Sequence, residues 1–237
     1  MSVFESRVRA YTKQRDELEK KISVFRELGV YCLIIDCLDE NPKNLTGIFN
    51  NLLLENPNMG LHLRYTLVYE DIKKFKRELN KFNNYPYILA VESPNVEIYN
   101  LAARDSRVDL LSFSELKYLN KVTPGILSLI KQNNKFIEFS FAPLMEDNRV
   151  KQSKNFRKLY RFLNLALKAK VRYILSGNFN KIYDFRHPRA LMSICMTLLD
   201  LNHTQAKDGF QKYPSELIKR INNRKNYKSI EDGVNIL

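Results

Sequence analysis

Seven short apolar runs, rich in β-branched and aromatic residues, recur along the chain at nearly regular intervals. They begin at residues 3, 31, 61, 87, 110, 136 and 173, so successive starts lie 23 to 37 residues apart. A strand and the helix that leads to the next parallel strand together take about 30 residues. The spacing therefore predicts seven βα units, a pattern typical of α/β proteins with a parallel sheet.

The expected strands are almost entirely apolar, as parallel strands buried on both faces should be. They are Val3–Val8, Tyr31–Asp36, Leu61–Leu67, Tyr87–Glu92, Leu110–Phe113, Phe136–Phe141 and Tyr173–Ser176. Helical periodicity of apolar residues predicts helices over Lys13–Leu28, Pro42–Leu54, Tyr69–Phe82, Asn155–Lys168, Pro188–Leu201 and Pro214–Asn223. Three of these begin with proline, which is favoured in the first turn of a helix.

Seven βα units without a break in composition favour a single-domain, closed or nearly closed α/β barrel of the TIM type. An open, doubly wound sheet is the alternative, because strand–helix alternation alone does not distinguish the two. We expect one domain over residues 1–225 and a loose tail over 226–237. In a barrel, ligand-binding side chains gather at the carboxyl ends of the strands. Those ends carry Asp36, Glu92, Ser112, Glu138 and Ser176-Gly177.

The positive charge is concentrated in the second half of the chain. Lys and Arg number 39 against 26 Asp and Glu, which gives a net charge of +13 at pH 7. Residues 147–189 carry twelve basic and two acidic side chains, and residues 207–228 carry seven and two, whereas residues 1–40 carry seven and eight. Charge needed for solubility alone would be spread evenly. The distribution therefore indicates a surface that binds a polyanion, either nucleic acid or a membrane surface.

Location is constrained by what the sequence lacks. No apolar run approaches the roughly 20 residues of a transmembrane helix, and Met1–Arg7 contains no apolar signal-peptide core. The three cysteines, Cys32, Cys37 and Cys195, lie in apolar stretches, where we expect buried thiols. We expect a cytoplasmic globular protein with no membrane partner.

Catalytic motifs are scarce. A metal-dependent phosphoesterase on a barrel needs several His and Asp ligands at the strand ends, and this chain has three His and no H-x-H pair. Asp36, Glu92 and Glu138 could hold Mg²⁺ weakly, but we favour their pairing with inward-pointing arginines. The sequence contains no phosphate-binding glycine loop and no G-x-S-x-G motif. A stand-alone metal-dependent phosphoesterase is therefore the alternative hypothesis, and a plain protein-interaction barrel is a third.

RNA binding has more support, and it begins with the helix expected over Asn155–Lys168. Its apolar residues fall on one stripe: Phe156, Leu159, Tyr160, Leu163 and Leu167. Its other side is basic and has no carboxylate: Lys154, Arg157, Lys158, Arg161 and Lys168. Such a surface neutralises phosphates. A membrane surface explains it less well, because the apolar stripe is needed to cover the sheet.

The loop Ser176–Arg189 extends this basic character. It carries Lys181, Arg186, His187 and Arg189, with Phe179, Tyr183 and Phe185 between them. Guanidinium groups and aromatic faces suit the phosphates and unpaired bases of structured RNA. We therefore favour an RNA-binding surface over a merely solvated one.

Four motifs follow one another in the order seen in a known family. The stretch Asn100–Leu111 contains N-x-x-A and V-D-L-L, and Glu138 with Pro143-Leu144 and Arg149 fits E-x-x-x-x-P-L … R. Ser176-Gly177 with Arg186-His187-Pro188-Arg189 fits S-G … R-x-P-x, and Ala206, Pro214, Leu217-Ile218 and Asn222-Asn223-Arg224 fit A … P … I … N-x-R. Over roughly residues 1–225 the chain resembles the archaeal and eukaryotic ribonuclease P protein component 3 family. It departs at Glu5-Ser6-Arg7, where an Asp-Leu-type opening is common.

The resemblance implies a TIM-barrel-like fold, related to the polymerase-and-histidinol-phosphatase (PHP) phosphoesterases but without their metal ligands. It implies a subunit of ribonuclease P, the endonuclease that removes the 5′ leader of precursor tRNA. The RNA performs that chemistry with Mg²⁺. The implied partners are the ribonuclease P RNA, a Pop5-type subunit and other ribonuclease P proteins, and precursor tRNA indirectly. At this length the chain is similar to archaeal members.

The expected site is therefore an RNA-binding surface, with no catalytic residue and no metal or cofactor held by this chain. We expect RNA contacts from Arg149, Arg157, Arg161, Arg172, Lys181, Arg186, Arg189 and Arg224. Arg104 and Arg107 are secondary candidates, because Asp105 and Asp109 can pair with them.

Overall fold

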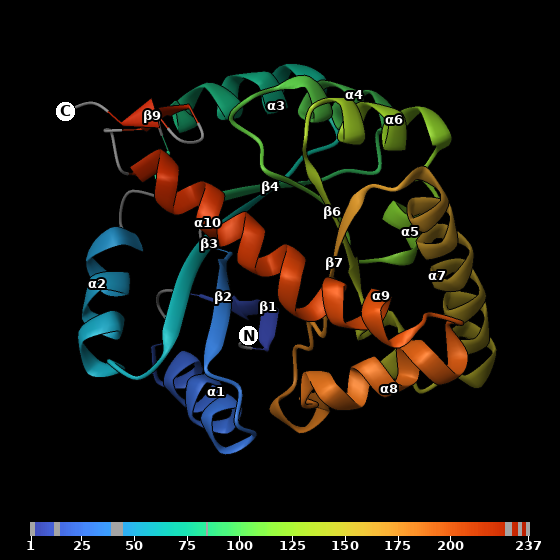
Figure 1. Ribbon diagram of the computed structural model, residues 1–237, viewed down its shortest axis with the longest axis horizontal. Helices are drawn as coiled ribbons and strands as arrows, with labels where there is room; N and C mark the ends of the chain where they lie inside the picture. Colours follow the sequence, from blue (N-terminus) through green and yellow to red (C-terminus); the bar gives the residue numbers. More distant parts are fainter. Residues whose placement is uncertain are drawn as a thin grey trace.

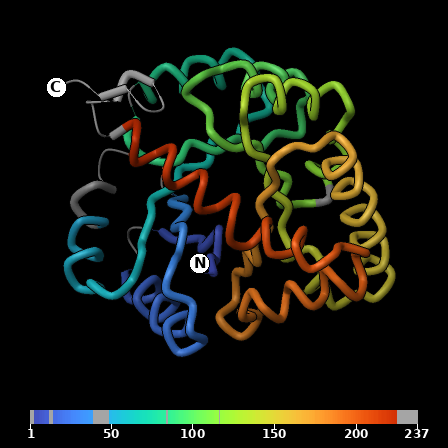
Figure 2. Tube along the Cα trace, in the orientation of Figure 1, coloured from blue at the N-terminus to red at the C-terminus, as the bar shows by residue number. Residues whose placement is uncertain are grey.

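Seven parallel strands form the centre of the computed structural model, which describes residues 3–11, 15–38, 45–83, 85–225, 229–231 and 234–235. The strands are β1 (Phe4–Ala10), β2 (Cys32–Cys37), β3 (Gly60–Val68), β4 (Ile88–Glu92), β5 (Leu110–Phe113), β6 (Phe136–Ser140) and β7 (Arg172–Ser176). They are hydrogen-bonded in chain order and curve into a nearly closed barrel (Figures 1 and 2). The predicted TIM-barrel-like fold and all seven predicted strands are confirmed.

Helices connect successive strands and cover the outside of the barrel (Figure 1). They are α1 (Arg15–Glu27), α2 (Leu45–Glu55), α3 (Ile72–Leu79), α4 (Val96–Arg104), α5 (Leu116–Leu119), α6 (Pro124–Gln132), α7 (Arg149–Ala169), α8 (Pro188–Leu198), α9 (His203–Lys207) and α10 (Tyr213–Lys225). Every predicted helix is present with bounds that differ by a few residues, although the start expected at Pro42 lies outside the described residues. Within the expected tail, Ser229–Glu231 and Val234–Asn235 pair as a short antiparallel ladder, and the rest lies outside the description.

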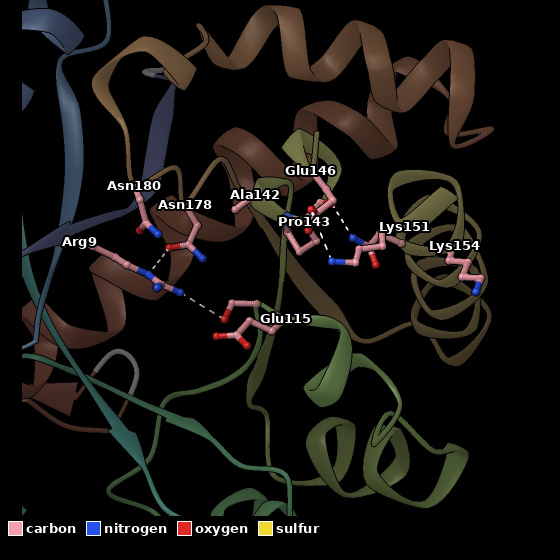
Figure 3. Close-up of a pocket in the computed structure, with 11 residues that line it drawn as sticks. Arg9, Glu115, Ala142, Pro143, Glu146, Lys151, Lys154, Asn178 and Asn180 are labelled. Atoms are coloured by element: carbon pink, nitrogen blue, oxygen red, sulfur yellow. Dashed lines mark hydrogen bonds and ion pairs between the residues drawn. The ribbon is translucent and has the colours of Figure 1, made fainter. Parts of the chain in front are cut away.

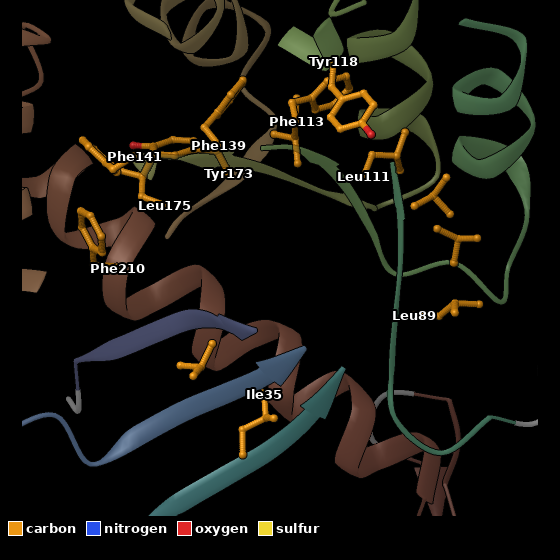
Figure 4. Close-up of a cluster of buried hydrophobic side chains, with 14 of the residues drawn as sticks. Ile35, Leu89, Leu111, Phe113, Tyr118, Phe139, Phe141, Tyr173, Leu175 and Phe210 are labelled. Carbon is orange, nitrogen blue, oxygen red and sulfur yellow. The ribbon is translucent and has the colours of Figure 1, made fainter. Parts of the chain in front are cut away.

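A layer of buried apolar side chains separates the sheet from the surrounding helices. Its aromatic members come from several elements and lie close together (Figure 4). Phe113 of β5 stacks on Tyr99 of α4 with ring centroids 4.4 Å apart, and Phe141 faces Phe210 at 6.0 Å. The burial of such apolar side chains is the dominant favourable contribution to the packing of helices on a sheet.

Inside the barrel, a second apolar cluster fills the end formed by the amino termini of the strands. Its members from the strands are Phe4, Ile34, Ile88, Ala90, Leu110, Phe136 and Ile174, and four of them are the first residue of their strand. Leu217, Ile218 and Ile221 of α10 belong to the same cluster, and α10 crosses the strands in Figure 1. Helix α10 therefore covers the end of the barrel formed by the amino termini of the strands.

The long helix α7 is rotated relative to the stripe expected from sequence. Leu159 and Leu163 are buried as predicted, but Tyr160 is 39% exposed, so its assignment to the buried stripe was wrong. Phe162 and Ala166 are buried instead. In a helix, residues 159, 163 and 166 lie on one face, and packing of this face against the barrel turns Tyr160 toward solvent.

Side chains join the two edge strands, β1 and β7. The carboxylate of Glu5 accepts hydrogen bonds from the Gly177 N–H at 3.0 and 3.2 Å, and Arg9 Nε donates to Asn178 Oδ1 at 2.8 Å. Glu5 and Asn178 are each about 1% exposed. These bonds complete the barrel where the backbone ladder of the described strands ends.

Substitution of Gly177 tests this closure. A methyl group there would lie 2.7 Å from both Glu5 Oε2 and a Phe179 ring carbon, and both side chains are buried. We expect Gly177→Ala to lower the free energy of unfolding by about 1–3 kcal/mol in urea titrations. Gly125→Ala is the control, because its methyl would meet nothing closer than Thr123 Oγ1 at 3.9 Å. Equal stability of the two variants would contradict the proposed role of the β1–β7 closure.

Candidate functional site

Inside the barrel, on the side of the second apolar cluster that faces the carboxyl ends of the strands, lies a network of buried charges centred on Arg7. Arg7 Nε lies 2.7 Å from Asp36 Oδ2, and Arg7 Nη1 lies 2.7 Å from Glu92 Oε1. Nη1 also donates to Ser112 Oγ at 3.1 Å. Arg7 is 2% exposed, so a charge at this position is stable only with such partners.

Arg64 of β3 supplies the second buried cation. Its Nη2 lies 2.7 Å from Glu138 Oε2, and its Nε donates to Thr66 Oγ1 at 3.0 Å. The Thr66 hydroxyl in turn donates to Asp36 Oδ1 at 2.7 Å. Two guanidinium groups thus link three carboxylates, and every strand from β1 to β6 contributes a charge or a hydrogen-bond partner, Ser112 being that of β5.

The arginines determine the ionisation of the carboxylates. Burial alone would raise the pKa of Glu92, but the charge and hydrogen bonds of Arg7 outweigh burial and hold this pKa below its ordinary value. For Glu138 the opposing effects are burial and the charges of Arg64 and Arg7, and its pKa is also lowered. Both groups are therefore ionised at neutral pH.

The favoured interpretation of the three strand-end carboxylates, pairing with inward-pointing arginines, is confirmed. Within the described part of the chain, no group of three or more His, Cys, Asp or Glu side chains is arranged to hold a metal ion. The two guanidinium groups lie among the carboxylates that a barrel metalloenzyme would offer to a cation. Arg64 was not singled out from the sequence, although an arginine in the middle of an otherwise apolar run was a usable signal.

Glu5 lies next to this network but behaves differently. Its carboxylate accepts hydrogen bonds from the backbone N–H groups of Arg7 and Gly177. Burial nevertheless raises its pKa to about 8, because these backbone donors only partly offset the loss of water. Glu5 is therefore a protonated side chain through most of the neutral range.

The outer face of α7 carries the basic surface expected from the sequence. Arg149, Arg157 and Arg161 are exposed, and no described carboxylate lies within 4 Å of any of them. Arg161 lies over the ring of Phe162, with its guanidinium carbon 5.7 Å from the ring centre. The N-cap Asn148 fixes the start of the helix by accepting from the Lys151 N–H at 3.0 Å.

The loop after β7 adds exposed cations beside buried aromatic rings. Lys181 and Arg186 lie in the loop and Arg189 in the first turn of α8, and all three are exposed. Arg186 Nη1 donates to the backbone carbonyls of Tyr183 and Phe185 at 2.8 and 2.9 Å. Phe185 is buried and stacks on Phe25 of α1 with centroids 4.5 Å apart, while Tyr183 is 91% exposed. Of the three aromatic residues that sequence reasoning offered for base stacking, Phe179 and Phe185 therefore anchor the loop, and Tyr183 presents a free face.

The remaining candidates are bonded within the protein or lie elsewhere. Arg172 donates to the Asn134 carbonyl at 2.9 Å, and Arg224 lies 2.9 Å from Asp109 Oδ2. Arg107 pairs with Asp105 at 2.7 Å, whereas Arg104 is exposed. Arg172 lies in β7, Arg224 in α10, Arg104 at the end of α4 and Arg107 just after it, so these four lie outside α7 and the loop after β7.

Comparisons with known proteins agree with this geometry. A family model described as RNase P subunit p30 matches residues 2–226. Ribonuclease P protein component 3 of Methanothermobacter thermautotrophicus is 23% identical over 171 residues, which cover 70% of this chain and 67% of that protein. The protein of the same name from Methanococcus maripaludis is 27% identical over 128 residues, 54% of this chain and 55% of that protein.

Among solved structures, a chain of an archaeal ribonuclease P with mature tRNA, determined by cryo-electron microscopy, has the same fold. The TM-score is 0.83 at 19% identity, with 99% of this chain and 97% of that chain covered. None of the helices over the described residues is long and apolar enough to cross a membrane.

Fold and site together define a TIM-barrel-like α/β protein whose interior carboxylates are paired with arginines and whose outer helix is basic. The match over nearly the whole chain identifies the particular family. The protein belongs to the RNase P subunit p30 family.

Replacement of one buried cation tests the ion network. Arg64→Met leaves Glu138 without its 2.7 Å partner, and we expect a loss of about 3–5 kcal/mol in the free energy of unfolding. Arg64→Met/Glu138→Gln should recover much of this loss, because Arg7 then serves the two remaining carboxylates. Arg77→Met, at a side chain that is 74% exposed, is the control and should cost little. A double variant as unstable as the single one would contradict charge balance as the cause.

Glu5 predicts a dependence of stability on pH. The unfolded chain loses this proton near pH 4.5, whereas the folded protein keeps it to about pH 8. Between these values unfolding releases a proton, so stability falls as pH rises, by about 1.4 kcal/mol per pH unit. Glu5→Gln stays neutral and escapes this loss. From pH 5.5 to 7.5 the stability of the variant relative to the natural protein should rise by about 2–3 kcal/mol in urea titrations, and a constant difference would refute the assignment.

Proposed function

We propose that this protein is an RNA-binding subunit of ribonuclease P that supports the catalytic RNA in removing the 5′ leader of precursor tRNA. Membership of the RNase P subunit p30 family carries the proposal. The arginines of α7, which are exposed and have no carboxylate partner among the described residues, supply the physical mechanism, because a cationic surface releases counterions from RNA phosphates when it binds.

The chemistry in this proposal belongs to the RNA and its Mg²⁺. Asp36, Glu92 and Glu138 are engaged by Arg7 and Arg64, and a carboxylate held in a buried ion pair is poorly placed to bind a catalytic metal. The protein thus contributes by neutralising phosphates and holding RNA elements in place.

We propose two sets of RNA contacts. The first set is exposed on α7, on the loop after β7 and at the start of α8: Arg149, Arg157, Arg161, Lys181, Arg186 and Arg189. The second set lies elsewhere on the molecule: Arg172, Arg224, Arg104 and Arg107. In the first set, Tyr183 offers an exposed ring on which an unpaired base can stack. A guanidinium already bonded to a carboxylate, as in Arg107 and Arg224, gains less from a phosphate, so we expect the first set to dominate.

The proposed partners follow from the same assembly. They are the ribonuclease P RNA, a Pop5-type subunit and other ribonuclease P proteins, with precursor tRNA contacted indirectly. The proposed location is the cytoplasm.

Reconstitution of the particle tests the proposal. Arg157→Gln/Arg161→Gln should flatten the salt dependence of RNA affinity by about two in log–log slope, if each residue contacts one phosphate. Arg186→Ala/Arg189→Ala should impair pre-tRNA cleavage more at low than at high Mg²⁺, because added cations replace lost protein charge. Arg77→Gln on α3 is the control, because it removes one positive charge at an exposed site outside the proposed interface.

Two results would count against the proposal. Unchanged cleavage at low Mg²⁺ in both pairs of variants would remove these residues from the RNA interface. Hydrolysis of phosphate esters by the isolated chain with Mn²⁺, lost in Asp36→Asn/Glu138→Gln, would instead favour a stand-alone phosphoesterase.

A further inference from the structure

A cavity of about 400 Å³, lined mainly by residues with polar side chains, opens at the carboxyl end of the barrel. One wall consists of Arg9 from β1 and Asn178 from the loop after β7, and the opposite wall consists of Lys151 and Lys154 from α7 (Figure 3). Glu115 also lines it. Its volume lies within the range of small-molecule sites, and its position is the one where TIM barrels bind their ligands.

Asn178 brings an unpartnered hydrogen-bond donor to the cavity. Its side chain is 1% exposed, and its Oδ1 accepts from Arg9 Nε at 2.8 Å. Its Nδ2 is buried and has no hydrogen-bond partner among the described residues, and in Figure 3 this amide nitrogen points away from Arg9, toward the side of the cavity where Pro143 lies. A buried donor without an acceptor costs about 1–3 kcal/mol, so an acceptor from outside the chain would be stabilising.

Arg9 presents a second donor group to the same space. Beyond its bond to Asn178, Arg9 Nη2 has a long contact of 3.5 Å with Ser114 Oγ. No described carboxylate lies within 4 Å of the Arg9 guanidinium. Burial and the neighbouring Arg7 cation lower the pKa of Arg9, and the more distant charges of Glu92, Asp36 and Glu115 offset this only in part. A cation that is partly desolvated and unpaired favours an anionic ligand.

We propose that this cavity binds the phosphate group of a nucleotide. Arg9 and Asn178 Nδ2 donate to the phosphate oxygens, and Lys154 adds positive charge from the opposite wall. Glu115 and Glu146 lie at the cavity as acceptors for hydroxyl or amino groups of the same ligand. The phosphate can belong to a free nucleotide or to the end of an RNA chain, and both present the same group to Arg9. The proposal does not depend on the assembly with ribonuclease P RNA.

Titration calorimetry of the full chain tests the proposal with inorganic phosphate, adenosine 5′-monophosphate and adenosine as probes. We expect the two phosphate-bearing probes to bind at one site and adenosine not to bind. A short RNA with a 5′-phosphate, compared with the same RNA bearing a 5′-hydroxyl, distinguishes the two sources of the phosphate by competition with adenosine 5′-monophosphate. Equal binding of adenosine and its monophosphate, or no binding of either phosphate probe at about 10 mM, would overturn the proposal.

Asn178→Asp is the sharpest variant. The residue has a left-handed backbone with φ of 51°, which Asp tolerates almost as well as Asn. Asp keeps the acceptor for Arg9 and replaces only the free donor with an anionic oxygen. We expect affinity for adenosine 5′-monophosphate to fall about tenfold or more.

Lys154→Gln provides a second variant that does not endanger folding, because Lys154 is exposed. It should weaken the same affinity about threefold to tenfold. Lys168→Gln carries the same charge change at the far end of α7 and is the matched control. Affinities of Asn178→Asp and Lys154→Gln equal to that of the control would refute the site.

Discussion

The pairing of charges inside the barrel is the constraint on which the rest of this structure depends. Asp36 and Glu138 are fully buried, and Glu92 is 3% exposed. Three carboxylates in such a place would repel one another and lose hydration, so the fold requires Arg7 and Arg64 at the positions that reach them. A shift of either strand by one residue would direct its arginine to the opposite face of the sheet. The network therefore specifies strand register as well as contributing stability.

This pairing also occupies the strand-end carboxylates that could otherwise serve as metal ligands. Strand-end carboxylates bind metals when a vacant coordination space lies between them. Here guanidinium groups lie between them, and Ser112 and Thr66 take up further oxygen lone pairs. Asn178, whose buried Nδ2 has no partner among the described residues, lies closer to the mouth of the barrel, where it lines the cavity together with Arg9.

Much of this architecture could be predicted from local sequence. Seven apolar runs at spacings near one βα unit were sufficient for the strands, and scarce histidine favoured ion pairs over a metal site. The rest depended on distant contacts. The rotation of α7 that exposes Tyr160 follows from how the helix packs on the barrel, and the partner of Arg224 is Asp109, 115 residues away. The orphaned amide of Asn178 depends on loop geometry, which no periodicity encodes.

The net charge of +13 consequently describes two physically different populations of cations. Arg7, Arg64 and Arg224 are held by carboxylates of the same chain, so they stabilise the fold and contribute little field at the surface. The arginines of α7 have no such partners among the described residues, and their field extends into solvent over about one Debye length. The net charge of the whole chain does not separate paired from unpaired cations. Counting basic and acidic residues segment by segment nearly does. The arginines of the barrel strands have carboxylate partners on other strands, whereas residues 147–189 contain almost no acidic residues. The positive charges of this segment have few acidic residues nearby in the sequence to neutralise them, so they remain available to bind a polyanion.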